Sequence, residues 1–109
     1  MPQKSCNGMG IGVFQILTDV DNGDPAVIAK RAEDLGFASY WVPEHGVIPK
    51  GSADIYPAKQ DDRPPPDYLY KMPDPFIALT RAASHTTEIG LGTGIALVPE
   101  RHPLLAAKE

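Results

Sequence analysis

Cysteine is almost absent from this chain of 109 residues, because Cys6 is the single one, and no disulfide can form within it. No apolar run approaches the roughly 20 residues that a membrane-spanning helix requires. The amino terminus also has no basic stretch followed by an apolar one, as a secretory signal would have. The net charge of -4 lacks the positive excess typical of nucleic-acid-binding domains. We therefore expect a cytoplasmic protein with neither a nucleic-acid partner nor a membrane anchor.

Proline, by contrast, is abundant. The chain has 12 prolines, and they cluster between Pro43 and Pro75. The segment shows no helical or strand periodicity, and long irregular loops in compact domains are uncommon and often functional. We expect a Pro-rich loop over residues 46–73. Residues 1–8 are polar and patternless, which predicts an unstructured leader and makes Met9 a candidate natural start.

Three apolar runs alternate with helical patterns. The runs are Gly10–Leu17, Phe37–Pro43 and Glu88–Val98. The dipeptides Asp24–Pro25 and Asp74–Pro75 each offer a capping carboxylate followed by proline at the first helical position, and Gly36 is placed to end the first helix. Pro103 opens a third helical pattern. The first run suits a strand buried on both faces, and the order predicts βαβ units with parallel strands and right-handed crossovers.

The alternation of strands and helices predicts an α/β fold. A doubly wound sheet and a TIM barrel both begin in this way, and the pattern does not separate them. The last helix reaches Glu109 with no terminating signal. A sheet of three strands would leave apolar faces and strand edges exposed, so we expect the chain to be a truncated part of a larger fold.

Ligands of both folds bind at the carboxyl ends of the strands. The segments that follow the three runs are Gln15–Asp19, Glu44–His45 and Thr93–Arg101. Histidine side chains can carry a proton to or from a substrate, which makes His45 a candidate, and a neighbouring carboxylate such as Glu44 can orient a histidine or raise its pKa. A loop-capping Glu44 beside an exposed His45 is an equally supported interpretation. The pattern of a zinc site is missing, so we expect no metal.

Gly90, Gly92 and Gly94 alternate through the third run. Their spacing is not that of a dinucleotide-binding fingerprint. Glycines inside a strand indicate a close approach, either of a planar ring or of a tightly packed helix, and at Gly94 we favour a bound ring. Arg101 stands before the helix at Pro103, where it is either part of a solvated turn or a contact to an anion or cofactor.

The motifs GVFQILTD, AEDLGFASYWVPEH and EIGLGTGIALVPERHPLLAAKE, in this order and spacing, cover most of residues 9–109. Together they resemble the opening of the luciferase-like monooxygenase superfamily, and within it the branch of coenzyme F420-dependent oxidoreductases. The third motif, with GTG followed by PERHPLL, is the most specific of the three.

The resemblance implies that residues 9–109 are the first three βα units of a truncated TIM (β/α)8 barrel. It implies a coenzyme F420 or FMN ring at the carboxyl ends of the strands, with a non-proline cis peptide at Gly94–Ile95 behind the ring. The cofactor-binding residues would be Phe14, Thr93, Gly94, Ile95 and Arg101. The catalytic residues would be His45, as proton donor or acceptor, and Glu44.

The implied reaction is hydride transfer through a deazaflavin, on a small-molecule substrate, in a full-length protein that we expect to be a homodimer. An FMN-dependent monooxygenase that uses oxygen is the alternative within enzymes. A non-catalytic barrel fragment that serves as an assembly module is the alternative outside them. A metal-dependent barrel hydrolase would need more His and Asp ligands at the strand ends than this segment shows.

Overall fold

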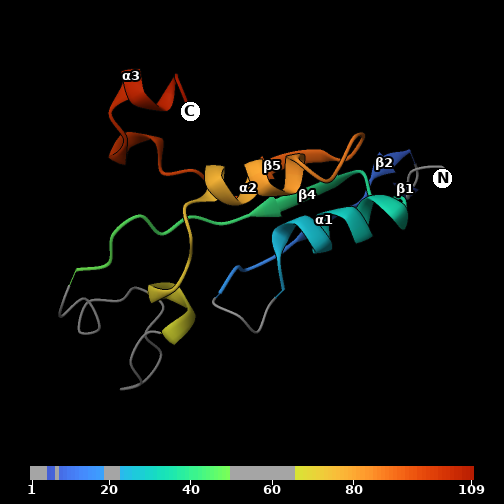
Figure 1. Cartoon of the computed structure of the whole chain (residues 1–109), viewed down its shortest axis with the longest axis horizontal. Coiled ribbons are helices and arrows are strands. Elements are labelled where there is room, and N and C mark those ends of the chain that lie inside the picture. Colours follow the sequence, from blue (N-terminus) through green and yellow to red (C-terminus); the bar gives the residue numbers. More distant parts are fainter. Residues whose placement is uncertain (1–4, 7, 19–22, 50–65) are drawn as a thin grey trace.

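The computed structural model describes residues 5–6, 8–18, 23–49 and 66–109, and Figure 1 shows their arrangement. The elements in chain order are strand β1 (Ser5–Cys6), strand β2 (Met9–Gly10), strand β3 (Gly12–Phe14), helix α1 (Pro25–Asp34), strand β4 (Ser39–Val42), a 3₁₀ turn (Asp67–Tyr70), helix α2 (Pro75–Ala83), strand β5 (Gly90–Thr93), a second 3₁₀ turn (Val98–Glu100) and helix α3 (Pro103–Ala106). The expected α/β fold with a parallel sheet is confirmed.

The parallel sheet has the strand order β3-β4-β5, so each strand lies beside the next one along the chain. Its register aligns Gly12 with Ser39 and Ser39 with Gly90. This order excludes a sheet in which the first strand lies between the second and the third. It is the order of a barrel, and also of the first half of a dinucleotide-binding sheet.

Both long helices begin at the Asp–Pro dipeptides, as predicted. Asp24 Oδ1 accepts a hydrogen bond from the backbone N–H of Ala26 at 2.9 Å, and Asp74 Oδ1 accepts one from Phe76 at 2.9 Å. These bonds satisfy amide groups that have no partner inside the helix. Gly36 follows α1 with φ of 79°, a left-handed conformation that favours glycine and ends the helix.

Helices α1 and α2 lie side by side on one face of the sheet, where they enclose the core (Figure 1). The residues that they bury there are mostly alanines, and small side chains let the helices approach the strands closely. Tyr40 and Val42 of β4 are fully buried beneath them. The buried members of the core are Leu17, Ala29, Ala32, Tyr40, Val42, Ala78, Ala82 and Ile89.

The opposite face of the sheet is open within the described part of the chain. Trp41 is 40% exposed and Phe14 is 53% exposed. Both side chains point away from α1 and α2, because successive residues of a strand face opposite sides. The expectation of a first strand buried on both faces was therefore wrong at Phe14, since only the helical face is covered.

The leader is not wholly unstructured, which corrects the expectation for residues 1–8. Ser5–Cys6 pairs in antiparallel fashion with Met9–Gly10. Gly8 between them has φ of 82°, which allows the short turn. Residues 1–4 and 7 lie outside the described residues.

Residues 50–65 of the expected loop over residues 46–73 lie outside the described residues, and its described part contains the 3₁₀ turn Asp67–Tyr70. The third strand is shorter than the run Glu88–Val98, because the chain leaves the sheet at a cis peptide bond between Gly94 and Ile95. Among the described residues, no helix is both long and apolar enough to cross a membrane.

Candidate active site

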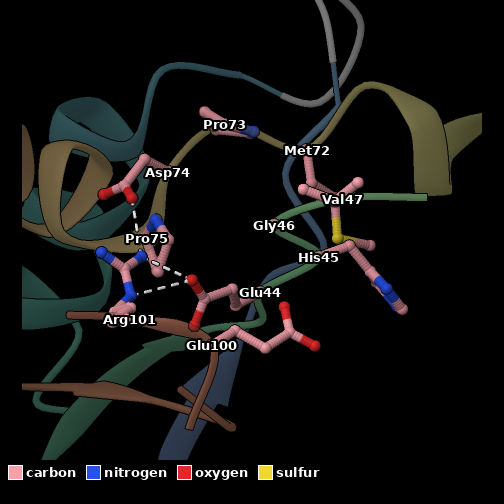
Figure 2. A pocket seen from close by; sticks show the side chains of 10 residues that line it. All are labelled: Glu44, His45, Gly46, Val47, Met72, Pro73, Asp74, Pro75, Glu100 and Arg101. Carbon is pink, nitrogen blue, oxygen red and sulfur yellow. Dashed lines mark hydrogen bonds and ion pairs between the residues drawn. The ribbon is translucent and has the colours of Figure 1, made fainter. Parts of the chain in front are cut away.

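A pocket of about 280 Å³ lies where β4 ends, beside the start of α2 and the segment after β5 (Figure 2). Two of the three segments singled out from the sequence, Glu44–His45 and Thr93–Arg101, contribute to it. The described residues 15–18 of the third segment do not line this pocket, and Asp19 lies outside the described residues. The pocket is lined by Glu44, His45, Gly46, Val47, Met72, Pro73, Asp74, Pro75, Glu100 and Arg101.

Glu44 is the buried carboxylate of this site, with 8% of its surface exposed. Its Oε2 accepts a hydrogen bond from the backbone N–H of Leu97 at 2.6 Å. Its Oε1 accepts bonds from Nε and Nη2 of Arg101, at 3.1 Å and 2.5 Å. Glu44 therefore joins the end of β4 to the segment that follows β5.

Arg101 is bound by more than Glu44. Its Nη2 also donates to Asp74 Oδ2 at 2.7 Å, and its Nη1 donates to Glu109 Oε2 at 2.9 Å. The guanidinium lies 4.6 Å from the centre of the Phe76 ring, within the range of a cation–π contact. We call the four charged residues Glu44, Asp74, Arg101 and Glu109 the Arg101 network.

The charges in this network stabilise one another. The hydrogen bonds of Asp74, and then of Glu44, raise the pKa of Arg101 above its usual value, so this side chain stays charged. Burial raises the pKa of Asp74, whereas its hydrogen bonds to Arg101 and to the first amides of α2 lower it. The lowering effects together are larger, so the pKa of Asp74 lies below its usual value. The contact between Asp74 and Arg101 thus favours the charged form of both side chains.

His45 follows Glu44 directly but does not join the network. Its imidazole is exposed and points away from Arg101 and Glu44 (Figure 2). Solvent therefore has access to the ring. The interpretation of Glu44 as a carboxylate that orients His45 finds no contact in the structure, and a loop-binding Glu44 beside an exposed His45 describes the observed geometry.

An apolar surface lies at the carboxyl ends of β3 and β5. The Phe14 ring packs on Gly94 so closely that a Cβ there would lie 3.0 Å from a ring carbon. The Gly94–Ile95 peptide is cis, which confirms the position implied by the resemblance. Ile95 is 69% exposed, and the preceding Thr93 pairs with Val42. The structure brings four of the five expected cofactor contacts to one edge of the sheet, but their binding role stays a prediction.

Gly90 and Gly92 have a different explanation from the two that the sequence offered. A Cβ at Gly92 would lie 2.5 Å from carbons of the Trp41 ring, so the planar ring that requires this glycine belongs to the protein itself. A Cβ at Gly90 would lie 3.3 Å from the carbonyl oxygen of Ala38. The indole also donates from Nε1 to Ser39 Oγ at 2.8 Å. Neither glycine serves to pack a helix.

The contacts of Asp74, Glu109 and Leu97 in this site were missed from the sequence. Asp74 was interpreted only as a helix cap, and Leu97 was given no role. These residues lie 27 and 4 positions from Arg101 in the chain, and Glu44 lies 57 positions away. No local spacing rule joins them, because the contacts depend on how the strand ends meet. Within the described ranges, no group of three or more His, Cys, Asp or Glu side chains is arranged to hold a metal ion.

Comparison with known proteins adds an independent finding. The model of a family described as luciferase-like monooxygenase matches residues 22–109. A protein of Mycobacterium tuberculosis, described as uncharacterized, is 36% identical over 94 residues, which is 85% of this chain and 33% of that protein. A protein of Mycobacterium bovis, also described as uncharacterized, matches with the same values. The chain thus spans about a third of the length of the curated relatives it matches. No solved structure is significantly similar to it.

Proposed function

The chain belongs to the luciferase-like monooxygenase family, and we propose that it forms the first three βα units of a TIM-barrel oxidoreductase that uses coenzyme F420, with FMN as the alternative cofactor. Three observations support the barrel. The strands follow one another in the order β3-β4-β5, α1 and α2 cover the same face, and the relatives are about three times as long. The later units of the barrel would then cover the open face that Trp41 and Phe14 occupy.

The observation on which the cofactor proposal rests is the apolar surface made by Phe14, Gly94 and Ile95. It lies at the carboxyl ends of the strands, the edge at which barrels bind their ligands. Phe14 and Ile95 expose 53% and 69% of their surface there. An exposed ring and a branched side chain beside a glycine fit one face of a planar isoalloxazine or deazaflavin ring.

This chain offers fewer contacts for the anionic part of such a cofactor than for its ring. Arg101 was expected to contact it, but its guanidinium is engaged by Glu44, Asp74 and Glu109. We therefore propose that the phosphate groups bind to later parts of the full-length protein. The ring would be contacted by residues of this chain, and the tail by residues beyond it.

His45 is the residue of this chain that we propose for proton transfer. It is an exposed residue of the pocket lining, and an imidazole can both donate and accept a proton. The bound cofactor would supply the hydride chemistry, or oxygen activation in the FMN case. The imidazole would hold or accept the proton at the substrate atom, and Val47 and Met72 would supply apolar contacts in the same pocket. Glu44, bound elsewhere, would not share the proton.

A binding titration of the intact protein with coenzyme F420 and with FMN, followed by fluorescence, tests the cofactor. Preference for F420 supports hydride transfer, and preference for FMN supports the oxygen-using alternative. Binding of neither contradicts the enzyme and favours the non-catalytic assembly module. The same sample, measured by light scattering, tests the homodimer that we also propose.

Replacing His45 with alanine tests proton transfer. We expect His45→Ala to lower turnover by about 10²–10⁴-fold with little change in cofactor affinity. His85→Ala is the matched control, because His85 is also exposed but lies in the joint between α2 and β5, bonded to Ser84 Oγ at 2.8 Å. Unchanged turnover in His45→Ala would rule out this assignment.

A further inference from the structure

We propose that Glu44 and Arg101 are positioning residues, which hold the turn after β5 against the end of β4 and thereby set the places of Ile95 and His45. The proposal rests on the proposed function for its consequence, the binding of the cofactor ring. Its geometric part concerns only the turn from Gly94 to Leu97, and it is tested without any cofactor.

The first step is the bond between Glu44 and Leu97. The Glu44 side chain is 5% exposed, and its Oε2 accepts the Leu97 N–H at 2.6 Å. The turn leaves the sheet at Gly94, whose N–H still donates to Val42 at 2.8 Å. The turn is therefore attached to β4 at both ends, once through Val42 and once through Glu44.

The second step is the role of Arg101 in holding Glu44. A guanidinium presents several donors in one plane and can bind more than one carboxylate at fixed angles. Here Nε and Nη2 bind Glu44, and Nη2 also binds Asp74, the cap of α2. One side chain thus joins the end of β4, the start of α2 and the segment after β5, as Figure 2 shows for Glu44 and Asp74.

The third step concerns what these anchors position. Ile95 lies two residues before Leu97, so fixing Leu97 limits where the exposed side chain of Ile95 can be. His45 follows Glu44, so fixing the Glu44 side chain also fixes the backbone from which His45 projects. The Glu44 carboxylate thus positions both Ile95, which we propose to contact the cofactor ring, and His45, which we propose for proton transfer.

The charge balance argues against direct cofactor binding by Arg101. Its side chain is 16% exposed and contacts three carboxylates at 2.5–2.9 Å. An anionic ligand would have to displace them and meet their negative charge. Arg101 therefore acts through Glu44 and the turn.

Amide hydrogen exchange of the intact protein tests the geometric part. We expect the Leu97 amide to exchange at least about tenfold faster in Glu44→Ala, since one hydrogen bond of ~1.4 kcal/mol corresponds to that factor. Glu44→Gln keeps an oxygen acceptor and should protect Leu97 more than alanine does. Glu33→Ala is the matched control, because Glu33 also accepts hydrogen bonds from backbone amides, but from those just before the start of β5. Unchanged Leu97 exchange in folded Glu44→Ala overturns the proposal, and so does unchanged Leu97 exchange in Arg101→Gln should the alanine variant not fold.

Cofactor titration tests the consequence. We expect Arg101→Gln to weaken binding of the preferred cofactor by about tenfold, with Arg101→Lys partly restoring it, while Leu97 exchange rises in parallel. Arg81→Gln is the control, because Arg81 binds the cap of α1, Asp24, and does not line the pocket. Weakened binding in Arg101→Gln with unchanged Leu97 exchange would overturn positioning and make Arg101 a direct contact. If the unaltered protein binds neither cofactor, the proposed function fails, and the exchange data alone decide whether the turn is held as proposed.

Discussion

Strand β5 is held at each end by a glutamate, but the two glutamates do different things. At its start, Glu33 of α1 accepts the backbone N–H groups of Thr87, Glu88 and Ile89 through a single oxygen, at 2.6–3.0 Å. Beyond its end, Glu44 divides its oxygens between the Leu97 amide and Arg101. Glu33 binds only neighbouring backbone amides through this oxygen, whereas Glu44 also binds Arg101 and so belongs to a network that borders a pocket.

The difference shows how one kind of bond serves structure in one place and a site in another. Glu33 has Lys30 as its charged neighbour at 3.1 Å, on the outer surface of α1. Glu44 is followed by the exposed His45 and faces the pocket. A carboxylate that binds backbone amides does not by itself indicate a functional site. The residues around it show whether it belongs to one.

The largest expected effect is that of removing Glu44. Glu44→Ala should lower the free energy of unfolding by about 3 kcal/mol, because it leaves a part-buried guanidinium with fewer partners and the Leu97 amide with none. Urea denaturation measures the change. The comparison fails if Glu33→Ala lowers the free energy of unfolding clearly more than Glu44→Ala does. The number of amide hydrogen bonds would then decide the loss, and the charged network would contribute nothing.

The next effect concerns the middle of β5. Gly92→Ala should cost about 2 kcal/mol, because the new Cβ would meet the Trp41 ring and force it to move. Trp41 is the single tryptophan, so its emission spectrum should shift as well. Gly46→Ala is the control, because the nearest atom to its Cβ would be Glu100 Oε2 at 3.5 Å, an ordinary contact. An unshifted spectrum in Gly92→Ala would contradict the packing of the indole on this strand.

The pH dependence of stability tests the hydrogen bonds of Glu33 at the start of β5. Hydrogen bonds from the Glu88 and Thr87 amides lower the pKa of Glu33 from 4.5 to about 2. A lowered folded-state pKa stabilises the protein fully above the unfolded value, and this contribution is lost as the pH falls from about 4.5 to about 2. Glu33→Gln should therefore remove part of the acid sensitivity. The melting temperatures of the two proteins should differ at pH 6 and approach each other near pH 2; a constant difference would show that ionisation is not the cause.

The smallest effect should come from Lys30. Its ion pairs with Glu33 and Asp34 lie on the exposed side of α1. Such pairs contribute little and are screened by salt. Lys30→Gln should leave the melting temperature almost unchanged at physiological salt. A large drop would mean that Lys30, rather than the amides, keeps Glu33 in place.

Local chemistry predicted much of this fold. The Asp–Pro dipeptides at positions 24 and 74 fixed where α1 and α2 begin, and Gly36 marked the end of α1, because capping depends on residues close together in the chain. The alternation of strands and helices predicted the parallel sheet. The site was harder, since Glu44 and Arg101 meet across 57 positions and only the strand register brings them together. The same register reveals that Trp41, rather than a bound ring, lies on Gly92.

The bonds that hold β5 have a consequence during synthesis of the chain. Glu33 and Glu44 emerge from the ribosome more than fifty residues before the groups that they bind. Until then their carboxylates remain hydrated, and the closure of so long a chain segment costs entropy before any bond forms. The partner groups become available in the order of translation, first Thr87–Ile89, then Leu97, and last Arg101. A nascent chain that ends between these points has the groups that hold the start of β5 but lacks those that hold its pocket end.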